Sequence, residues 1–210
     1  MSALDDDIQE ILIDAQSIQE RVNQLGQRLT RLYEGQVPIL VGVLKGAMPF
    51  LVDLMRAMAI PLQVDFMAVS SYGRGSRSSG VVRILMDLSM SIEGRDVLIV
   101  EDIVDTGLTL EYLRTYLLNQ GPRSLRIVAL LDKVLPKKAD VPLDLVGFRI
   151  PNEFVVGYGL DYGERYRNLP YVGILKPNVI VEEAIAQQYA ASSSMIERSS
   201  EEGMKELYDR

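Results

Sequence analysis

The sequence predicts an α/β fold in which helices cover both faces of a mainly parallel, twisted sheet. Apolar strand patterns alternate along the chain with helical ones, an order that is typical of parallel sheets. Conspicuous turns follow several of the strands, at the sheet edge where ligands bind in such folds. The 210 residues are 48% hydrophobic, which is enough for one domain with a substantial core.

The first predicted elements occupy the N-terminal 86 residues. After Asp14, a suitable N-cap, apolar residues recur in steps of three and four as far as residue 32, and they predict an amphipathic helix. Residues 37–44 form a buried-type strand, and a Lys-Gly turn leads from it into a helix that ends near residue 59. Two strands, residues 62–70 and 81–86, then flank a polar loop rich in Gly, Ser and Arg.

The remaining elements continue the alternation and then lose it. A buried-type strand begins at residue 97 and ends in two adjacent carboxylates, residues 109–119 predict a helix, and residues 125–131 predict another strand. Three short strands, expected to form a small lobe over the sheet, follow at residues 143–148, 154–158 and 171–175. We therefore expect one domain of residues 1–180 and an acidic C-terminal extension of residues 181–210.

Composition excludes several kinds of site. Cysteine and histidine are both absent, so disulfides, thiolate zinc sites and Ser-His-Asp triads are impossible and acid–base chemistry must use Asp, Glu, Lys or Tyr. A net charge of −7 argues against broad binding to nucleic acid or to anionic membranes. The N-terminal residues lack the pattern of a secretory signal, and no apolar stretch is long enough to span a bilayer. We expect a cytoplasmic protein that binds neither nucleic acid nor membrane.

The most informative motif lies where the strand that begins at residue 97 ends. Glu101 and Asp102 are adjacent near its end, and Asp105-Thr106-Gly107 then turns the chain into a helix. Free backbone N–H groups in such a turn bind phosphate, whereas the two carboxylates would repel it. The carboxylates therefore need another partner, either two vicinal sugar hydroxyls or a Mg²⁺ ion held through water. The motif predicts a site for a phosphorylated ribose.

This motif resembles the ribose-phosphate signature of the phosphoribosyltransferases. Four motifs match that family in its order over about residues 14–177, and they are similar to those of the bacterial hypoxanthine-guanine enzymes. The resemblance implies the type I phosphoribosyltransferase fold with a base-binding hood. It also implies purine salvage, in which 5-phosphoribosyl 1-diphosphate (PRPP) donates its phosphoribosyl group to N9 of hypoxanthine or guanine, giving IMP or GMP and pyrophosphate. Dependence on Mg²⁺ and a homo-oligomer, dimer or tetramer, are further implications.

The resemblance assigns roles around the sugar. Asp105 would be the catalytic general base that assists the N7 proton of the purine, and its carboxylate would stabilise positive charge developing on the ribose. Mg²⁺ would be held by Glu101, Asp102 and Asp161. The ribose and its 5-phosphate would be bound by Glu101, Asp102, Asp105, Thr106, Gly107, Leu108 and Thr109. Leu108 places an apolar side chain in the phosphate turn, so only its amide can contact phosphate.

The resemblance also assigns the pyrophosphate site and a lid. Pyrophosphate would be bound by Leu44, Lys45, Gly46 and Arg167. In the family the peptide corresponding to Leu44-Lys45 can be cis. Arg165 is a rival to Arg167 that the sequence does not separate. Ser71 and Tyr72 match the start of the family's flexible loop, which closes over the site and excludes water.

Base recognition is assigned to residues after the strand at 125–131. Lys133 would donate to the exocyclic oxygen of a 6-oxopurine, because an ammonium is a donor only. Phe154 would stack on the planar base, and main-chain groups near Val155 would read its edge. Asp161 would lie near the purine 2-position.

Two alternatives stay open. A xanthine-guanine enzyme would share these motifs, because discrimination depends on donors and acceptors around the purine 2-position. A nucleotide-sensing regulator on the same fold would keep the phosphate turn but lose the base site or bind nucleic acid. The presence of Asp105, Lys133 and Asp161 disfavours the regulator, and a structural protein would leave the strand-end carboxylates unexplained.

Overall fold

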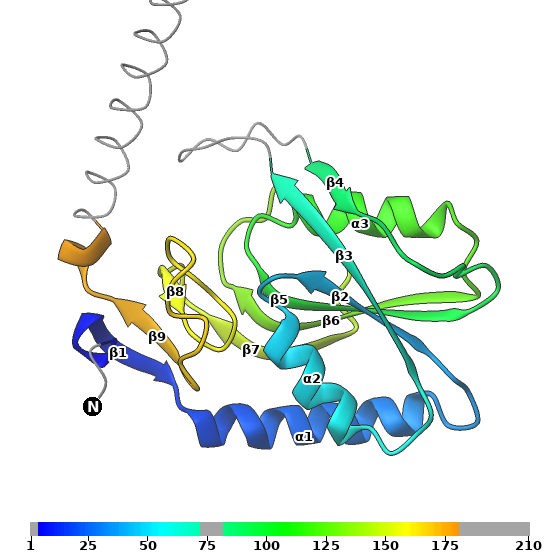
Figure 1. Cartoon of the computed structure of the whole chain (residues 1–210), viewed down its shortest axis with the longest axis horizontal. Coiled ribbons are helices and arrows are strands. Elements are labelled where there is room, and N and C mark those ends of the chain that lie inside the picture. Colours follow the sequence, from blue (N-terminus) through cyan, green and yellow to red (C-terminus); the bar gives the residue numbers. More distant parts are fainter. Residues whose placement is uncertain (1–3, 72–81, 181–210) are drawn as a thin grey trace, which may run out of the picture. The chain divides into compact units, whose positions relative to one another are not determined.

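The computed structural model describes residues 4–71 and 82–180 (Figure 1). These residues divide into two compact units, the smaller of residues 4–10 and 174–180 and the larger of residues 11–173. In the smaller unit, the backbone N–H of Lys176 donates to the carbonyl oxygen of Asp7 at 2.9 Å. Tyr72 and the C-terminal extension lie outside the described residues.

The larger unit is built on a six-stranded sheet with the strand order β4-β3-β2-β5-β6-β7. Strand β3 pairs with β4 in the antiparallel sense, and the other neighbours are parallel. The strands, in sheet order, are Val82–Met86, Gln63–Ser71, Ile39–Leu44, Asp96–Val104, Ser124–Lys133 and Leu145–Ile150. The mainly parallel sheet predicted from the sequence is confirmed.

Helices cover both faces of this sheet. Helices α1 (Ala15–Leu32) and α2 (Met48–Ala57) pack together on one side, and α3 (Leu108–Leu118) lies on the other (Figure 1). Helix α1 begins as predicted, because the Asp14 carboxylate accepts from the Ser17 backbone N–H at 2.7 Å. Gly26 lets α1 approach α2 closely, since a Cβ there would lie 2.5 Å from the Ala57 Cβ.

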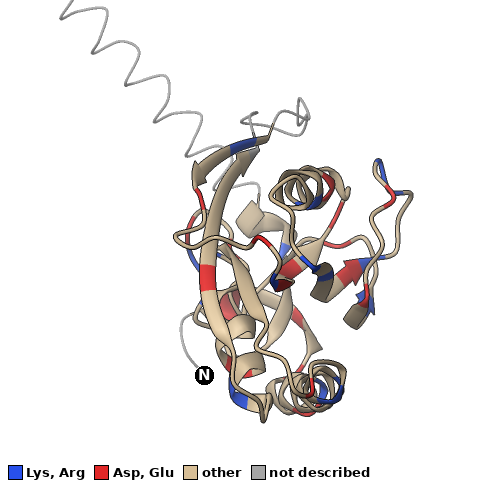
Figure 2. Cartoon of the chain, turned by 90° about the vertical axis from the view of Figure 1, so that its right-hand side faces the viewer, with Lys and Arg blue, Asp and Glu red and all other residues tan. Residues whose placement is uncertain are grey.

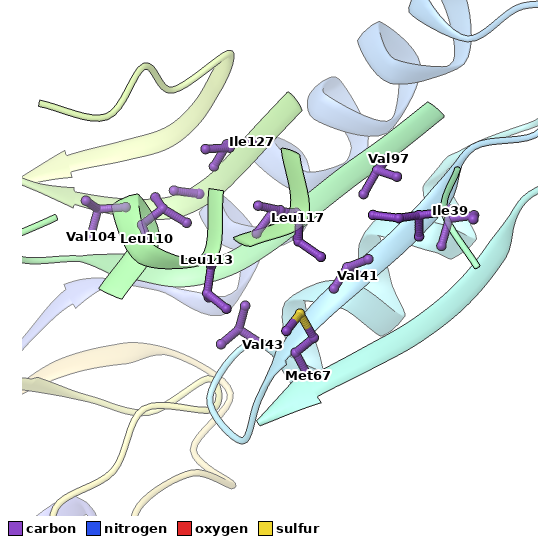
Figure 3. Packing of buried hydrophobic residues seen from close by; sticks show 13 residues of the cluster. Ile39, Val41, Val43, Met67, Val97, Val104, Leu110, Leu113, Leu117 and Ile127 are labelled. Atoms are coloured by element: carbon purple, nitrogen blue, oxygen red, sulfur yellow. The ribbon is translucent and has the colours of Figure 1, made fainter. Parts of the chain in front are cut away.

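The core explains why the central strands are apolar on both faces. On the α3 side, alternate residues of β2 and β5 pack against the leucines of that helix (Figure 3). On the opposite side, a Cβ at Gly42 would lie 2.7 Å from Leu51 of α2, so strand and helix are in close contact there too. Because both faces are covered, β2 and β5 form continuous hydrophobic runs.

The C-terminal strands differ in part from the prediction. Residues 143–148 were expected in a small lobe, but β7 extends the main sheet as a parallel neighbour of β6. Gly147 permits this, because a Cβ there would lie 2.4 Å from the Leu130 carbonyl oxygen. A separate three-stranded sheet has the order β1-β9-β8. Its strands, in sheet order, are Ile8–Ile13, Val172–Leu175 and Val155–Val156. The sequence analysis did not predict the first of these strands.

Acidic and basic positions are interspersed along the described part of the ribbon (Figure 2). Within the described residues, no helix is long and apolar enough to cross a membrane.

Candidate active site

A cleft of about 110 Å³, open to solvent, lies where β5 ends and α3 begins. Strand β5 brings Glu101 to its edge, and the following turn contributes Asp105 and the backbone that leads into the helix. Five predicted ribose-phosphate residues line the cleft, namely Glu101, Asp105, Thr106, Gly107 and Thr109. Asp102 and Leu108, which were predicted with them, are not among its lining residues. The structure thus places together most of the residues that the strand-end motif predicted.

The turn at residues 105–107 lines this cleft and leads into α3. Gly107 is the N-cap of α3 and has φ +84°, a left-handed conformation that favours glycine. The first N–H groups of a helix have no carbonyl partner within it, so those of α3 are available to an anion. A Cβ at Gly107 would lie 2.5 Å from the carbonyl oxygen of Ala139, so the turn packs tightly against the segment after β6.

Glu101 and Asp102 lie on opposite faces of β5. Glu101 belongs to the α3 side, where its Oε2 is buried without a hydrogen-bond partner among the described residues. Burial, with the neighbouring Asp102 carboxylate, raises the pKa of Glu101 well above its usual value. Asp102 lies on the other side, against the turn after β2, since a Cβ at Gly46 would be 1.7 Å from its Oδ2. Burial raises the pKa of Asp102 to about 6, although the Ile103 backbone N–H donates to it at 2.9 Å.

The turn after β2 carries the first part of the predicted pyrophosphate site. The Leu44-Lys45 peptide bond is cis, as the resemblance implied. Gly46 lies between two neighbours, with Asp102 on one side and Gly159 on the other. A Cβ at Gly159, which has φ +101°, would lie 2.0 Å from the Gly46 carbonyl oxygen. The turn therefore contacts the Asp102 side chain at the end of β5, and it contacts the loop after β8 through backbone atoms.

Four charged side chains meet beside this turn. The Arg167 Nη2 lies 2.8 Å from Asp161 Oδ1 and 3.2 Å from Glu164 Oε2. The same Glu164 oxygen lies 3.0 Å from the Lys45 ammonium. Lys45 and Arg167, predicted to bind pyrophosphate, are thus brought together by one carboxylate. Arg165 is exposed, and its guanidinium lies 5.4 Å from the Tyr166 ring centre.

The predicted base-recognition residues lie at the end of β6 and in or next to β8. Lys133, at the end of β6, is only 11% exposed, and its ammonium lies 3.6 Å from Asp105 Oδ2. Phe154 is 44% exposed and meets Tyr162 edge to face, with ring centres 5.2 Å apart. Val155 is buried in β8. Ser71, predicted in the flexible loop, is the last residue of β3.

Sequence reasoning missed two residues at the edge of the site. Glu164, described above, has a positive φ of 65° and follows Asp161, whose carboxylate accepts from its backbone N–H at 2.9 Å. Lys137 donates to the carbonyl oxygens of Val104 and Asp105 at 2.8 and 2.9 Å. These two hydrogen bonds stabilise the backbone of the turn at residues 105–107. The only sequence signal for the role of Lys137 was the basic pair Lys137-Lys138 after Pro136.

Within the described residues, no group of three or more acidic side chains forms a ready metal site. Glu101, Asp102 and Asp161 are therefore not gathered around one point. They still suit Mg²⁺, because this ion commonly uses one or two carboxylates together with substrate phosphates and water. The buried, unpartnered Oε2 of Glu101 is the oxygen that most needs such a partner.

The phosphoribosyl transferase domain matches residues 9–163 of this chain. The chain belongs to the phosphoribosyltransferase family. The hypoxanthine-guanine phosphoribosyltransferase of Bacillus subtilis (strain 168) is 54% identical over 173 residues, covering 82% of this chain and 96% of that protein. The corresponding enzyme of Mycobacterium bovis is 54% identical over 179 residues, covering 82% and 89%. The family and the fold predicted from the strand-end motif are confirmed.

Solved structures of this phosphoribosyltransferase family give the same result. A hypoxanthine phosphoribosyltransferase from Staphylococcus aureus has a TM-score of 0.82 and 49% identity, covering 85% of this chain and 97% of that one. The chain is also similar to a longer protein, the bifunctional protein TilS/HprT of Listeria monocytogenes, to which it is 53% identical over 180 residues. This chain covers only 28% of that protein's length.

Proposed function

We propose that the protein transfers the 5-phosphoribosyl group of PRPP to N9 of hypoxanthine or guanine. The observation that carries this proposal is the juxtaposition of Asp105 and Lys133. The Lys133 ammonium, which suits a 6-oxopurine, lies 3.6 Å from the Asp105 carboxylate at the mouth of the phosphate cleft. A base seated between Lys133 and Phe154 would thus present its imidazole edge toward the ribose held by the cleft.

The chain's own groups support binding of PRPP at both ends. Backbone N–H groups of residues 105–109 would hold the 5-phosphate at the start of α3. Lys45 and Arg167, which are 3.0 and 3.2 Å from a shared carboxylate oxygen, would hold the diphosphate in place of that carboxylate. Glu101 lines the same cleft as the start of α3, and ribose hydroxyls can donate to it there. This arrangement fixes the anomeric carbon near the base.

Transfer forms the bond between purine N9 and the anomeric carbon and breaks the bond from that carbon to pyrophosphate. The N7 proton of the purine passes to Asp105, whose carboxylate also stabilises the positive charge that builds on the ribose. Lys133 donates to the O6 oxygen, which orients the base for attack by N9 and stabilises the purine as its N7 proton leaves. The Lys133 ammonium beside Asp105 keeps this carboxylate in position for the proton.

Enzymes of this family generally depend on Mg²⁺. We propose that Glu101, Asp102 and Asp161 hold it together with PRPP. When bound, Mg²⁺ would neutralise the polyanionic substrate and help pyrophosphate to leave.

The test is nucleotide formation from PRPP and Mg²⁺ with hypoxanthine, guanine, xanthine and adenine. Hypoxanthine and guanine should react, and adenine should not, because a 6-amino group cannot accept from Lys133. Asp105→Asn should lower kcat by about 10²- to 10⁴-fold, the range for loss of a general base. The exposed Asp140→Asn serves as the matched control and should keep full activity.

Other outcomes would replace this proposal. Faster reaction with xanthine than with hypoxanthine would favour a xanthine-guanine enzyme, whose distinguishing contacts are near Asp161 and Val155. If PRPP or a nucleotide binds but no base reacts, the protein is a nucleotide-sensing regulator on this fold.

A further inference from the structure

Glu164 occupies a position that suits a phosphate oxygen. Its Oε2 lies 3.0 Å from the Lys45 ammonium and 3.2 Å from Arg167 Nη2. These are the two cations that the proposed function assigns to pyrophosphate. Ionised oxygens at these distances are strong acceptors, so the carboxylate satisfies both cations when no diphosphate is present. The two cations also lower the pKa of Glu164, Lys45 more than Arg167, and so keep the carboxylate charged.

We propose that Glu164 is an internal competitor of pyrophosphate, whose carboxylate leaves Lys45 and Arg167 when the diphosphate binds and returns when it departs. This inference rests on the proposed function, because it concerns the same diphosphate site. It adds a residue that tunes affinity for PRPP and pyrophosphate without touching the reacting atoms.

The carboxylate is held weakly enough to be displaced. The side chains of Lys45 and Glu164 are 67% and 64% exposed, and exposed ion pairs contribute little to stability. A diphosphate carries several charges and can contact both cations at once, so it should win this competition.

The backbone of Glu164 can stay in place while its side chain moves. Its N–H donates to Asp161 Oδ2 at 2.9 Å, and this contact does not involve the carboxylate of Glu164 itself. Arg167 is likewise held independently, because its Nη1 donates to the Gly159 carbonyl at 2.8 Å and its Nη2 contacts Asp161. Removing the Glu164 charge should therefore free the Lys45 ammonium and one of the two carboxylate contacts of Arg167, without collapsing the loop.

The test is direct titration of Mg²⁺ and pyrophosphate into the full chain by calorimetry, comparing wild type with Glu164→Gln. Loss of the competing charge should tighten pyrophosphate binding by about 3- to 10-fold, the size expected from two exposed ion contacts. The KM for PRPP should fall in the same direction, and pyrophosphate should become a stronger product inhibitor. Raising the salt concentration should shrink the difference, because exposed charges are screened.

Two controls separate this effect from a change in net charge or in folding. Glu34→Gln removes the same charge at an exposed position far along the sequence and should leave pyrophosphate affinity unchanged. Lys45→Met removes one of the cations and should weaken binding. Glu164→Ala, with its melting temperature measured alongside, repeats the test should Glu164→Gln prove unstable.

Weaker or unchanged pyrophosphate binding in both Glu164 variants would overturn the inference, because it would make this carboxylate a support for the anion or a bystander. The proposed function would survive that result if wild type still forms nucleotide. If wild type neither forms nucleotide nor binds pyrophosphate with Mg²⁺, the proposed function fails first, and the inference with it.

Discussion

Strand β5 carries buried carboxylates at both ends, and these carboxylates differ in their hydrogen-bond donors and in the direction of their pKa shifts. At the start, Asp96 accepts from Arg123 Nε at 3.0 Å and from Ser124 Oγ at 2.8 Å, and the Arg123 contact lowers its pKa. Near the end, burial raises the pKa values of Glu101 and Asp102. The same strand thus holds one carboxylate that is saturated with donors and two that are short of them.

The difference separates a structural acid from a functional one. A buried carboxylate with enough donors contributes to stability and needs nothing further. Buried carboxylates without donors cost stability, and sites that tolerate this cost are candidates for ligand binding. The comparison therefore locates the active end of the sheet without reference to any relative.

The largest effect should come from neutralising an acid at the active end. We expect Asp102→Asn to lower kcat/KM for PRPP by about 10- to 100-fold, because an amide cannot replace a charged acceptor. Its free energy of unfolding at pH 7 should stay equal or rise, since a buried charge without sufficient donors is removed. Steady-state kinetics and urea unfolding test this together. A large loss of stability in this variant would show that Asp102 is a structural acid like Asp96, and it would contradict the comparison.

Neutralising the acid at the other end should do the reverse. We expect Asp96→Asn to lower the free energy of unfolding by about 2 kcal/mol, because charge-assisted hydrogen bonds to a buried carboxylate are lost. The kcat of the folded variant should match that of wild type. Urea unfolding monitored by circular dichroism gives the first quantity, with Glu34→Gln as the control for charge. An unchanged unfolding midpoint would show that Asp96 is not a structural acid.

A lysine behind the phosphate turn should have a smaller effect on activity. Lys137→Met removes the ammonium that donates to the Val104 and Asp105 carbonyls, so the turn should loosen. We expect the KM for PRPP to rise about 10-fold, with kcat changed less, because loss of a charged hydrogen bond costs about 1.5 kcal/mol or more. The exposed neighbour Lys138→Met should leave KM unchanged, and Lys137→Arg should restore most of the affinity.

The smallest effects should appear in the pH dependence of stability. The folded pKa of Asp96 lies below its unfolded value, so its contribution is present above about pH 4 and is lost as the pH falls further. The folded pKa of Asp102 is about 6, above its unfolded value of 3.8, so stability is lost as the pH rises through that interval. Asp96→Asn should therefore be less stable than wild type at pH 7, and Asp102→Asn more stable.

Both variants should approach the stability of wild type at low pH. Urea midpoints measured at pH 3, 5 and 7 would test this convergence. A stability difference for Asp102→Asn that persists unchanged at pH 3 would contradict the assigned origin of the effect.

The strand-end motif allowed much of this site to be predicted, because its information is local. Glu101, Asp105 and Gly107 follow one another within seven residues, and the turn that joins them brings them to one cleft. The separation of Asp102 from that cleft also follows from the alternation of side chains along a strand, although the sequence analysis did not use it.

Other contacts join residues that are distant in the sequence, and nothing in a single sequence marks them. Glu164 meets Lys45 across 119 positions, and Lys137 meets Val104 across 33. The place of β7 was missed for a related reason. A six-residue strand with a glycine inside carries a weak pattern, and its pairing with β6 decides where it lies.

The contact between Gly46 and Gly159 has a consequence for how new specificities could arise. The turn that carries Lys45 and the loop that leads to Asp161 and Arg167 touch through main-chain atoms, with no side chain between them. Their spacing is therefore insensitive to the exchange of neighbouring side chains. Lys133 and Phe154 lie outside this contact, so a library that varies only these two positions can explore other bases while the proposed diphosphate site keeps its geometry.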